Sequence, residues 1–77
     1  MNDVHKEFES KLRSAFKAKC EISVWSIEAG HFVGFEIRRG RNRYWANDYL
    51  ASGLSTAHDV QVNVRAIANA LPVSWRA

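Results

Sequence analysis

The chain has 77 residues, 47% hydrophobic and 25% charged, a composition that excludes a disordered chain and predicts one compact domain over residues 1–77. It has no apolar run long enough to span a membrane, no signal-peptide pattern at its start, and a single cysteine, Cys20, which excludes an internal disulfide; we therefore expect a cytoplasmic protein. A net charge of +3 makes nucleic acid a candidate partner, although eight acidic residues are interspersed among the basic ones.

The first predicted element is a helix over residues 3–19. Asn2 or Asp3 can cap its start by accepting backbone N–H bonds. The apolar residues that follow recur at helical spacing and form one packing stripe: Val4, Phe8, Leu12, Ala15 and Phe16. We expect the rest of this helix to be solvated.

Residues 21–28 are predicted to form a strand, because serines and β-branched residues accompany a tryptophan. The turn that follows decides which face is buried. A two-residue turn at Ala29-Gly30 points Val24 inward and Trp25 outward, and a three-residue turn reverses these directions. Because tryptophan is usually well buried, we favour Trp25 in the core. In the alternative, it joins Trp45 on an exposed aromatic face.

Residues 32–50 are predicted to form a hairpin. Apolar side chains occupy every second position from Val33 to Ile37, and Gly40 supplies the positive φ that a tight turn requires. With Gly40-Arg41 as the loop, the pairs are Arg38 with Arg43, Ile37 with Tyr44, Glu36 with Trp45 and Phe35 with Ala46. This register buries Tyr44 and exposes Trp45, and a one-residue slip would exchange them.

The hairpin holds the candidate binding residues. These are Arg38, Arg39, Arg41, Arg43, Trp45 and Tyr49. The arginine side chain binds carboxylate or phosphate through two N–H groups, and Trp, Tyr and Arg are the residue types that dominate binding hot spots. The alternative is a charged hairpin tip that only prevents edge-to-edge aggregation.

A second helix is predicted over residues 57–71. Thr56 and Asp59 approximate a capping box, and Pro72 ends the segment. Helical spacing relates Val60, Val64, Ile67, Ala68 and Leu71, whereas Val60, Val62 and Val64 also alternate as in a strand. The alanines at positions 66, 68 and 70 favour the helix. Trp75 is expected to fold back over the edge of the core; an exposed Trp75 would instead be a contact residue.

No pattern for catalysis or metal binding is found in the sequence. The histidines and the cysteine are far apart and lack metal-ligand spacing: His5, Cys20, His31 and His58. The four glycines stand alone, and no serine lies in a nucleophile elbow. Glu36 and Asp48 form an imaginable carboxylate pair, but so small a sheet leaves little room for a water-excluding pocket. We therefore expect no enzymatic activity, no cofactor and no metal.

The predicted order α-β-β-β-α gives a single small α+β domain in which two helices back a three-stranded antiparallel sheet. This order, the length and the closing helix resemble the double-stranded RNA-binding domain. Gly30-His31 falls where that family has a histidine in its first hairpin loop, and residues 66–71 resemble its Ala- and Leu-rich last helix. The family grips phosphates with lysines at the start of its second helix, where residues 55–59 here contain none. The resemblance therefore implies a helix-backed sheet without that grip.

Two functions fit the hairpin. The favoured one is a small non-enzymatic protein that docks on a protein partner and acts by occlusion. Phage-encoded inhibitors such as anti-CRISPR proteins have this size and character, which is an analogy, since no motif identifies one. The alternative is a nucleic-acid-binding module whose arginines contact phosphates while Trp45 stacks on a base. We expect no membrane partner, and a monomer or a homodimer joined at one hairpin edge.

Overall fold

The computed structural model of the chain describes residues 3–77. Its elements are α1 (Asp3–Ala15), β1 (Glu21–Ile27), β2 (Phe32–Arg39), β3 (Asn42–Leu50), the 3₁₀ helix η1 (Ala51–Leu54), α2 (Ala57–Ala70) and the 3₁₀ helix η2 (Val73–Trp75). The predicted α-β-β-β-α order and the α+β class are confirmed. The predicted cap at Asn2 or Asp3 and the predicted packing of Val4 concern side chains outside the described part.

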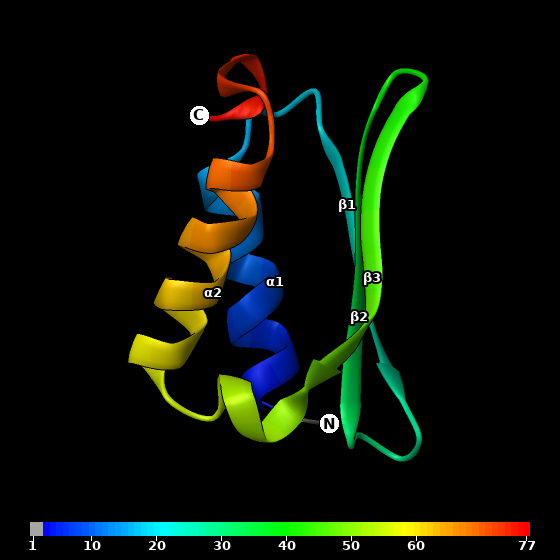
Figure 1. Cartoon of the computed structure of the whole chain (residues 1–77), viewed down its shortest axis with the longest axis vertical. Coiled ribbons are helices and arrows are strands. Elements are labelled where there is room, and N and C mark those ends of the chain that lie inside the picture. Colours follow the sequence, from blue (N-terminus) through cyan, green and yellow to red (C-terminus); the bar gives the residue numbers. More distant parts are fainter. Residues whose placement is uncertain (1–2) are drawn as a thin grey trace.

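The helices and the sheet form two layers (Figure 1). The strands are antiparallel in the order β1-β2-β3, so β2 is central and the other two are edge strands. Both helices lie on the same side of the sheet and pack against each other. Within residues 3–77 the sheet therefore has one face covered by helices, the inner face, and one uncovered face, the outer face. Neither helix in this range has the length and apolar character that a membrane crossing requires.

Helix α1 is four residues shorter than predicted. It ends at Ala15 because the C-terminal segment binds the backbone groups of what would have been its last turn. Lys17 N donates to Trp75 O at 2.9 Å, and Ala77 N donates to Ala15 O at 3.0 Å. The predicted end at residue 19 is wrong because these bonds join segments that are far apart in the sequence, which local periodicity does not register.

The hairpin of β2 and β3 has the predicted register. Gly40-Arg41 is the loop, and Gly40 has a φ of 61°. The pairs are Arg38 with Arg43, Ile37 with Tyr44, Glu36 with Trp45 and Phe35 with Ala46. The slip that would exchange Tyr44 and Trp45 between faces does not occur.

A β-bulge interrupts this ladder further from the loop. Val33 pairs with Tyr49, which lies three residues beyond the partner of Phe35. Two residues of β3 therefore oppose Gly34 alone. Without the extra residue, Asp48 would lie opposite Val33 and face the core. The bulge instead brings the Tyr49 ring to the inner face, with its centroid 5.3 Å from that of Phe35.

The second helix is confirmed, and the rival strand prediction for its first half is excluded. Thr56 Oγ1 accepts a hydrogen bond from Asp59 N at 3.0 Å, which is the predicted N-cap. Val60 and Val64 are buried while Val62 is 51% exposed. In a strand all three valines would share one face, whereas in a helix Val60 and Val64 share a face that Val62 does not. The observed burial therefore follows the helical spacing.

The core lies between the inner face of the sheet and the helices. Its largest fully buried side chains are Phe8, Leu12, Val33, Phe35, Ile37, Leu54, Val60 and Ile67. The rings of Phe8 and Phe35 meet edge-on with centroids 5.8 Å apart, which joins α1 to β2. Trp75 is 7% exposed and folds back onto this core, as predicted.

Replacing Phe8 or Phe35 with alanine is expected to lower the free energy of unfolding by roughly 3–5 kcal/mol, because a fully buried ring is lost and a cavity remains. Urea unfolding followed by circular dichroism measures the change. Phe35→Leu should give a smaller loss and serves if the alanine variants do not fold. The exposed Val62→Ala is the control, with a change within about 0.5 kcal/mol. Equal losses at Val62 and Phe35 would contradict the assigned core.

Candidate docking face of the sheet

The outer face carries its side chains in four cross-strand rows. From the hairpin tip, the rows are Glu21 with Arg38 and Arg43; Ser23 with Glu36 and Trp45; Trp25 with Gly34; and Ile27 with Phe32 and Leu50. The charges therefore gather at the tip end of the face and the apolar groups at the other end. The apolar side chains of the outer face are those of Trp25, Ile27, Phe32, Trp45 and Leu50.

Trp25 lies on the outer face, so the favoured prediction that it belongs to the core is wrong. Strand β1 has the register of a two-residue turn at Ala29-Gly30, which places Trp25 directly opposite Gly34. The indole covers Gly34 so closely that a Cβ added there would clash with its Nε1. The ring is therefore half-buried on the backbone of the neighbouring strand rather than under a helix.

Two arginines of the predicted site lie on the outer face, each beside a carboxylate. Arg38 Nη2 donates to Glu21 Oε2 at 2.6 Å, and this bond together with the Glu21 charge raises the pKa of the Arg38 guanidinium. Arg43 Nη1 lies 3.4 Å from Glu36 Oε2, and its guanidinium stacks 5.5 Å from the Trp45 ring centroid. Both pairs lie at the surface, where ion pairs contribute little to stability.

The other two arginines lie elsewhere. Arg39 points to the inner side of the hairpin, where its Nη1 donates to Ser74 O at 2.6 Å. Arg41 lies in the exposed loop and has no ion pair within the described residues. The four arginines therefore do not form one cluster: two are paired on the outer face, one ties the hairpin to η2, and one projects from the tip.

Trp45 and Tyr49 lie on opposite faces. Trp45 is on the outer face and is 48% exposed. The Tyr49 ring lies on the inner face, with its centroid 6.1 Å from that of Phe8. Burial raises the pKa of the Tyr49 phenol, and the nearby charges of Tyr44 and Asp48 raise it further. Of the two aromatic residues in the predicted site, the structure brings Trp45 to the uncovered face and packs Tyr49 against the core.

Two further features of the described residues bear on catalysis. Residues 3–77 contain no group of three or more His, Cys, Asp or Glu side chains that is arranged to hold a metal ion. A groove of about 320 Å³ lies between α1 and α2, with apolar Ala15, Val64 and Ala68 beside the cations Lys11 and Arg65. No carboxylate, imidazole or thiol lines this groove, so it offers no acid–base pair.

No family model, no curated protein and no solved structure matches this chain. The α-β-β-β-α topology that resembles the double-stranded RNA-binding domain is present in the structure, but no family match supports membership of that family. The outer face must therefore be interpreted from its own geometry.

Phe32 and Leu50 also lie on the outer face, although neither is among the predicted site residues. Because side chains alternate along a strand, the sequence already indicated that Phe32 and Val33 point to opposite faces of the sheet. Leu50 points outward only because the bulge shifts the alternation of β3 by one residue. A glycine in β2 facing the polar pair Asn47-Asp48 is the signal that indicates such a bulge.

Gly34→Ala is expected to lower the free energy of unfolding by about 1–3 kcal/mol, because its methyl group would occupy the space of the Trp25 indole. In a Trp25→Ala background the same change should cost less than about 0.5 kcal/mol, since the obstructing ring is gone. A double-mutant cycle measured by urea unfolding gives the difference. Equal costs in the two backgrounds would show that the indole does not lie over Gly34.

The raised pKa of Tyr49 predicts a loss of stability in alkali. The folded state holds the phenol proton more tightly than the unfolded state, whose tyrosine has a pKa of about 10. The contribution of the Tyr49 phenol to the free energy of unfolding is therefore fully present below about pH 10, and it is lost as the pH rises through the folded pKa. Tyr49→Phe should lose less stability than the wild type between about pH 9 and about pH 11 in urea unfolding. Tyr44→Phe retains Tyr49 and should still show the loss; an identical loss in Tyr49→Phe and the wild type would contradict the assignment.

Proposed function

We propose that this chain is a non-enzymatic binding protein that docks on a protein partner through the outer face of its sheet, with Trp45 at the centre of the contact. The observation that carries the proposal is an uncovered sheet face that combines an exposed tryptophan with adjacent arginines. Tryptophan and arginine are the side chains on which binding energy at protein interfaces concentrates.

The Trp45 side chain is held in place before any partner arrives. Arg43 stacks on its ring, and Glu36 in the same row lies 3.4 Å from Arg43. Trp25 is fixed over Gly34 in the next row. Side chains that are already ordered lose less conformational entropy on association, which favours affinity.

The charges at the tip favour an acidic partner surface. Arg41 projects there without an ion pair among the described residues, and Arg38 and Arg43 have only exposed pairs. An acidic surface would replace the carboxylates of Glu21 and Glu36 at little cost. Docking of this kind covers the partner's surface, so the mode of action we propose is occlusion.

The nucleic-acid alternative stays a prediction and has weaker support. Arg39 would not contribute to phosphate binding on the outer face, because it lies on the inner side of the hairpin and donates to the carbonyl of Ser74. The resemblance to the double-stranded RNA-binding domain adds nothing to it, because residues 55–59 carry the helix cap of α2 in place of lysines. Phosphate binding would make affinity fall steeply with salt, whereas a contact centred on Trp45 should fall much less.

The test is capture of a protein partner from native lysate treated with nuclease, using wild type, Trp45→Ser and Val62→Ser. Trp45 and Val62 are similarly exposed, 48% and 51%, but Val62 lies on α2, away from the outer face. We expect Trp45→Ser to lose at least about tenfold in affinity for the captured protein and Val62→Ser to bind as the wild type does.

Thermal unfolding of the three proteins is the control for folding. Capture that is unchanged in Trp45→Ser would refute docking through the outer face. Capture that occurs in untreated lysate and disappears after nuclease treatment would replace the protein partner with nucleic acid.

A further inference from the structure

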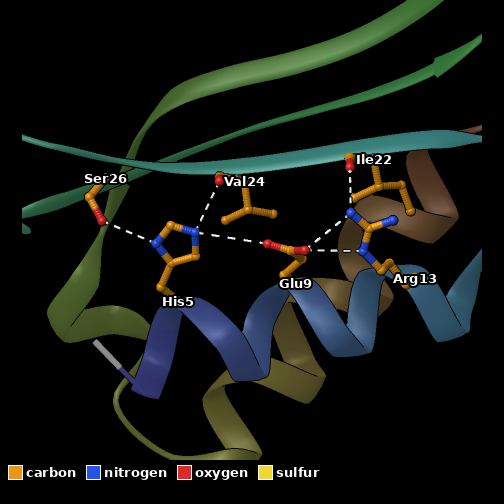
Figure 2. A network of polar contacts seen from close by, with 6 residues as sticks. All are labelled: His5, Glu9, Arg13, Ile22, Val24 and Ser26. Atoms are coloured by element: carbon orange, nitrogen blue, oxygen red, sulfur yellow. Dashed lines mark hydrogen bonds and ion pairs between the residues drawn. The ribbon is translucent and has the colours of Figure 1, made fainter. Parts of the chain in front are cut away.

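The two edges of the sheet differ in what covers them. On β1, side chains of α1 bind the outward-pointing backbone carbonyls (Figure 2). His5 Nε2 donates to Val24 O at 3.0 Å, and Arg13 Nη2 donates to Ile22 O at 3.0 Å. A strand from another chain would have to displace both side chains to pair with β1. This edge is closed.

Glu9 holds both of these side chains in position. Its Oε2 accepts from Arg13 Nε at 3.1 Å, and its Oε1 lies 4.0 Å from His5 Nε2 (Figure 2). Because the Val24 carbonyl can only accept, Nε2 of His5 donates to the strand, and Nδ1 on the other side of the ring forms a hydrogen bond of 3.1 Å with the Ser26 hydroxyl. The cover of the β1 edge is thus a connected set of polar contacts along one side of α1.

The β3 edge has no such cover. Since the carbonyls of Ile22 and Val24 point away from β2, the alternation of antiparallel ladders fixes the direction of the other backbone groups in the sheet. On β3, Tyr44 turns its backbone N–H and C=O toward β2, whereas Arg43 and Trp45 turn theirs to the free edge. Within residues 3–77, no side chain or other segment forms a hydrogen bond with these four groups.

We propose that the β3 edge takes an extended segment of the protein partner as a fourth strand, and that this segment carries a carboxylate where it passes Arg43. This inference deepens the proposed function, on which it rests, by naming how the partner is held. Strand addition supplies main-chain hydrogen bonds for affinity, and the side chains beside the edge give specificity.

The bulge sets the length of the segment. Regular pairing of β3 extends from Asn42 to Ala46, and Asn47-Asp48 then form the bulge. Bulges at sheet edges terminate pairing, so the added strand is limited to about five residues, which is an ordinary strand length.

Neighbouring side chains set the chemistry of the segment. On the outer face an added strand would place alternate residues beside Arg43 and Trp45, at cross-strand distances of about 5 Å. Arg43 and the unpaired Arg41 favour a carboxylate there, and Trp45 favours an apolar group two residues away. A second copy of this chain fits less well, since its own outward residues on β3 are again Arg43 and Trp45 and supply no carboxylate.

The first test uses a short synthetic peptide in which a glutamate and a valine stand two residues apart, so that both side chains lie on the same face of the added strand, and its counterpart with lysine for glutamate. Amide hydrogen exchange is followed by NMR at Arg43 and Trp45, with Val24 on the closed edge as control. The glutamate peptide is expected to slow exchange at Arg43 and Trp45 by about tenfold or more, with Val24 unchanged.

Unchanged exchange at Arg43 and Trp45, or equal slowing by the lysine peptide, would overturn the proposal. Slowing that depends on protein concentration without peptide would also overturn it, because the occupant of the edge would then be a second copy.

The second test separates strand addition from docking by the face alone. Arg43→Pro and Arg43→Thr both lose the guanidinium, but only proline loses the outward N–H. That N–H does not face β2, so proline leaves the native ladder intact, and circular dichroism verifies that both variants fold. We expect Arg43→Pro to bind the captured partner at least about tenfold more weakly than Arg43→Thr. If the two variants bind equally while Trp45→Ser loses the partner, strand addition fails and docking through the outer face stands.

Discussion

The packing of Phe8 on α1 against Phe35 on β2 decides which face of the sheet is buried. Both helices lie on that side (Figure 1), and within residues 3–77 nothing lies over the other face. Strand alternation then sends Trp25 and Trp45 outward because their neighbours point inward. The uncovered outer face is therefore a direct consequence of a core that is built on one side only.

Apolar groups on an uncovered sheet face add little to the stability of the isolated chain, because they stay in contact with water. A partner that covered them would remove this apolar surface from water. The structure limits their exposure by local means: Trp25 lies over the backbone of Gly34, and Arg43 stacks on Trp45. The two edge strands also differ. Helix α1 covers the backbone of β1 through His5, while the outer edge of β3 stays uncovered. An uncovered face and an open edge meet at Trp45, so the partner segment that we propose would contact both.

Features set by neighbouring residues were predictable from the sequence. The alternation around Gly40 gave the hairpin register, and helical spacing gave α2. Several features set by distant residues were not. Trp25 was assigned to the core on its usual burial, because the glycine that receives its ring lies on another strand. Likewise, Arg39 points inward to a C-terminal carbonyl, and Tyr49 reaches the inner face only through the bulge. The sequence alone indicated that the site contains arginine and tryptophan. How these side chains are divided between the two faces depends on the tertiary structure.

Selective oxidation of tryptophan, read by mass spectrometry in the free protein and in the complex with its partner, tests most directly whether the outer face is the docking surface. In the free protein, Trp45 at 48% exposure should react much faster than Trp75 at 7%. On partner binding, oxidation of Trp45 is expected to slow by about tenfold or more because the contact excludes water, while Trp75 reacts as before. Oxidation of Trp45 at the same rate in the free protein and in the complex would exclude the outer face as the docking surface.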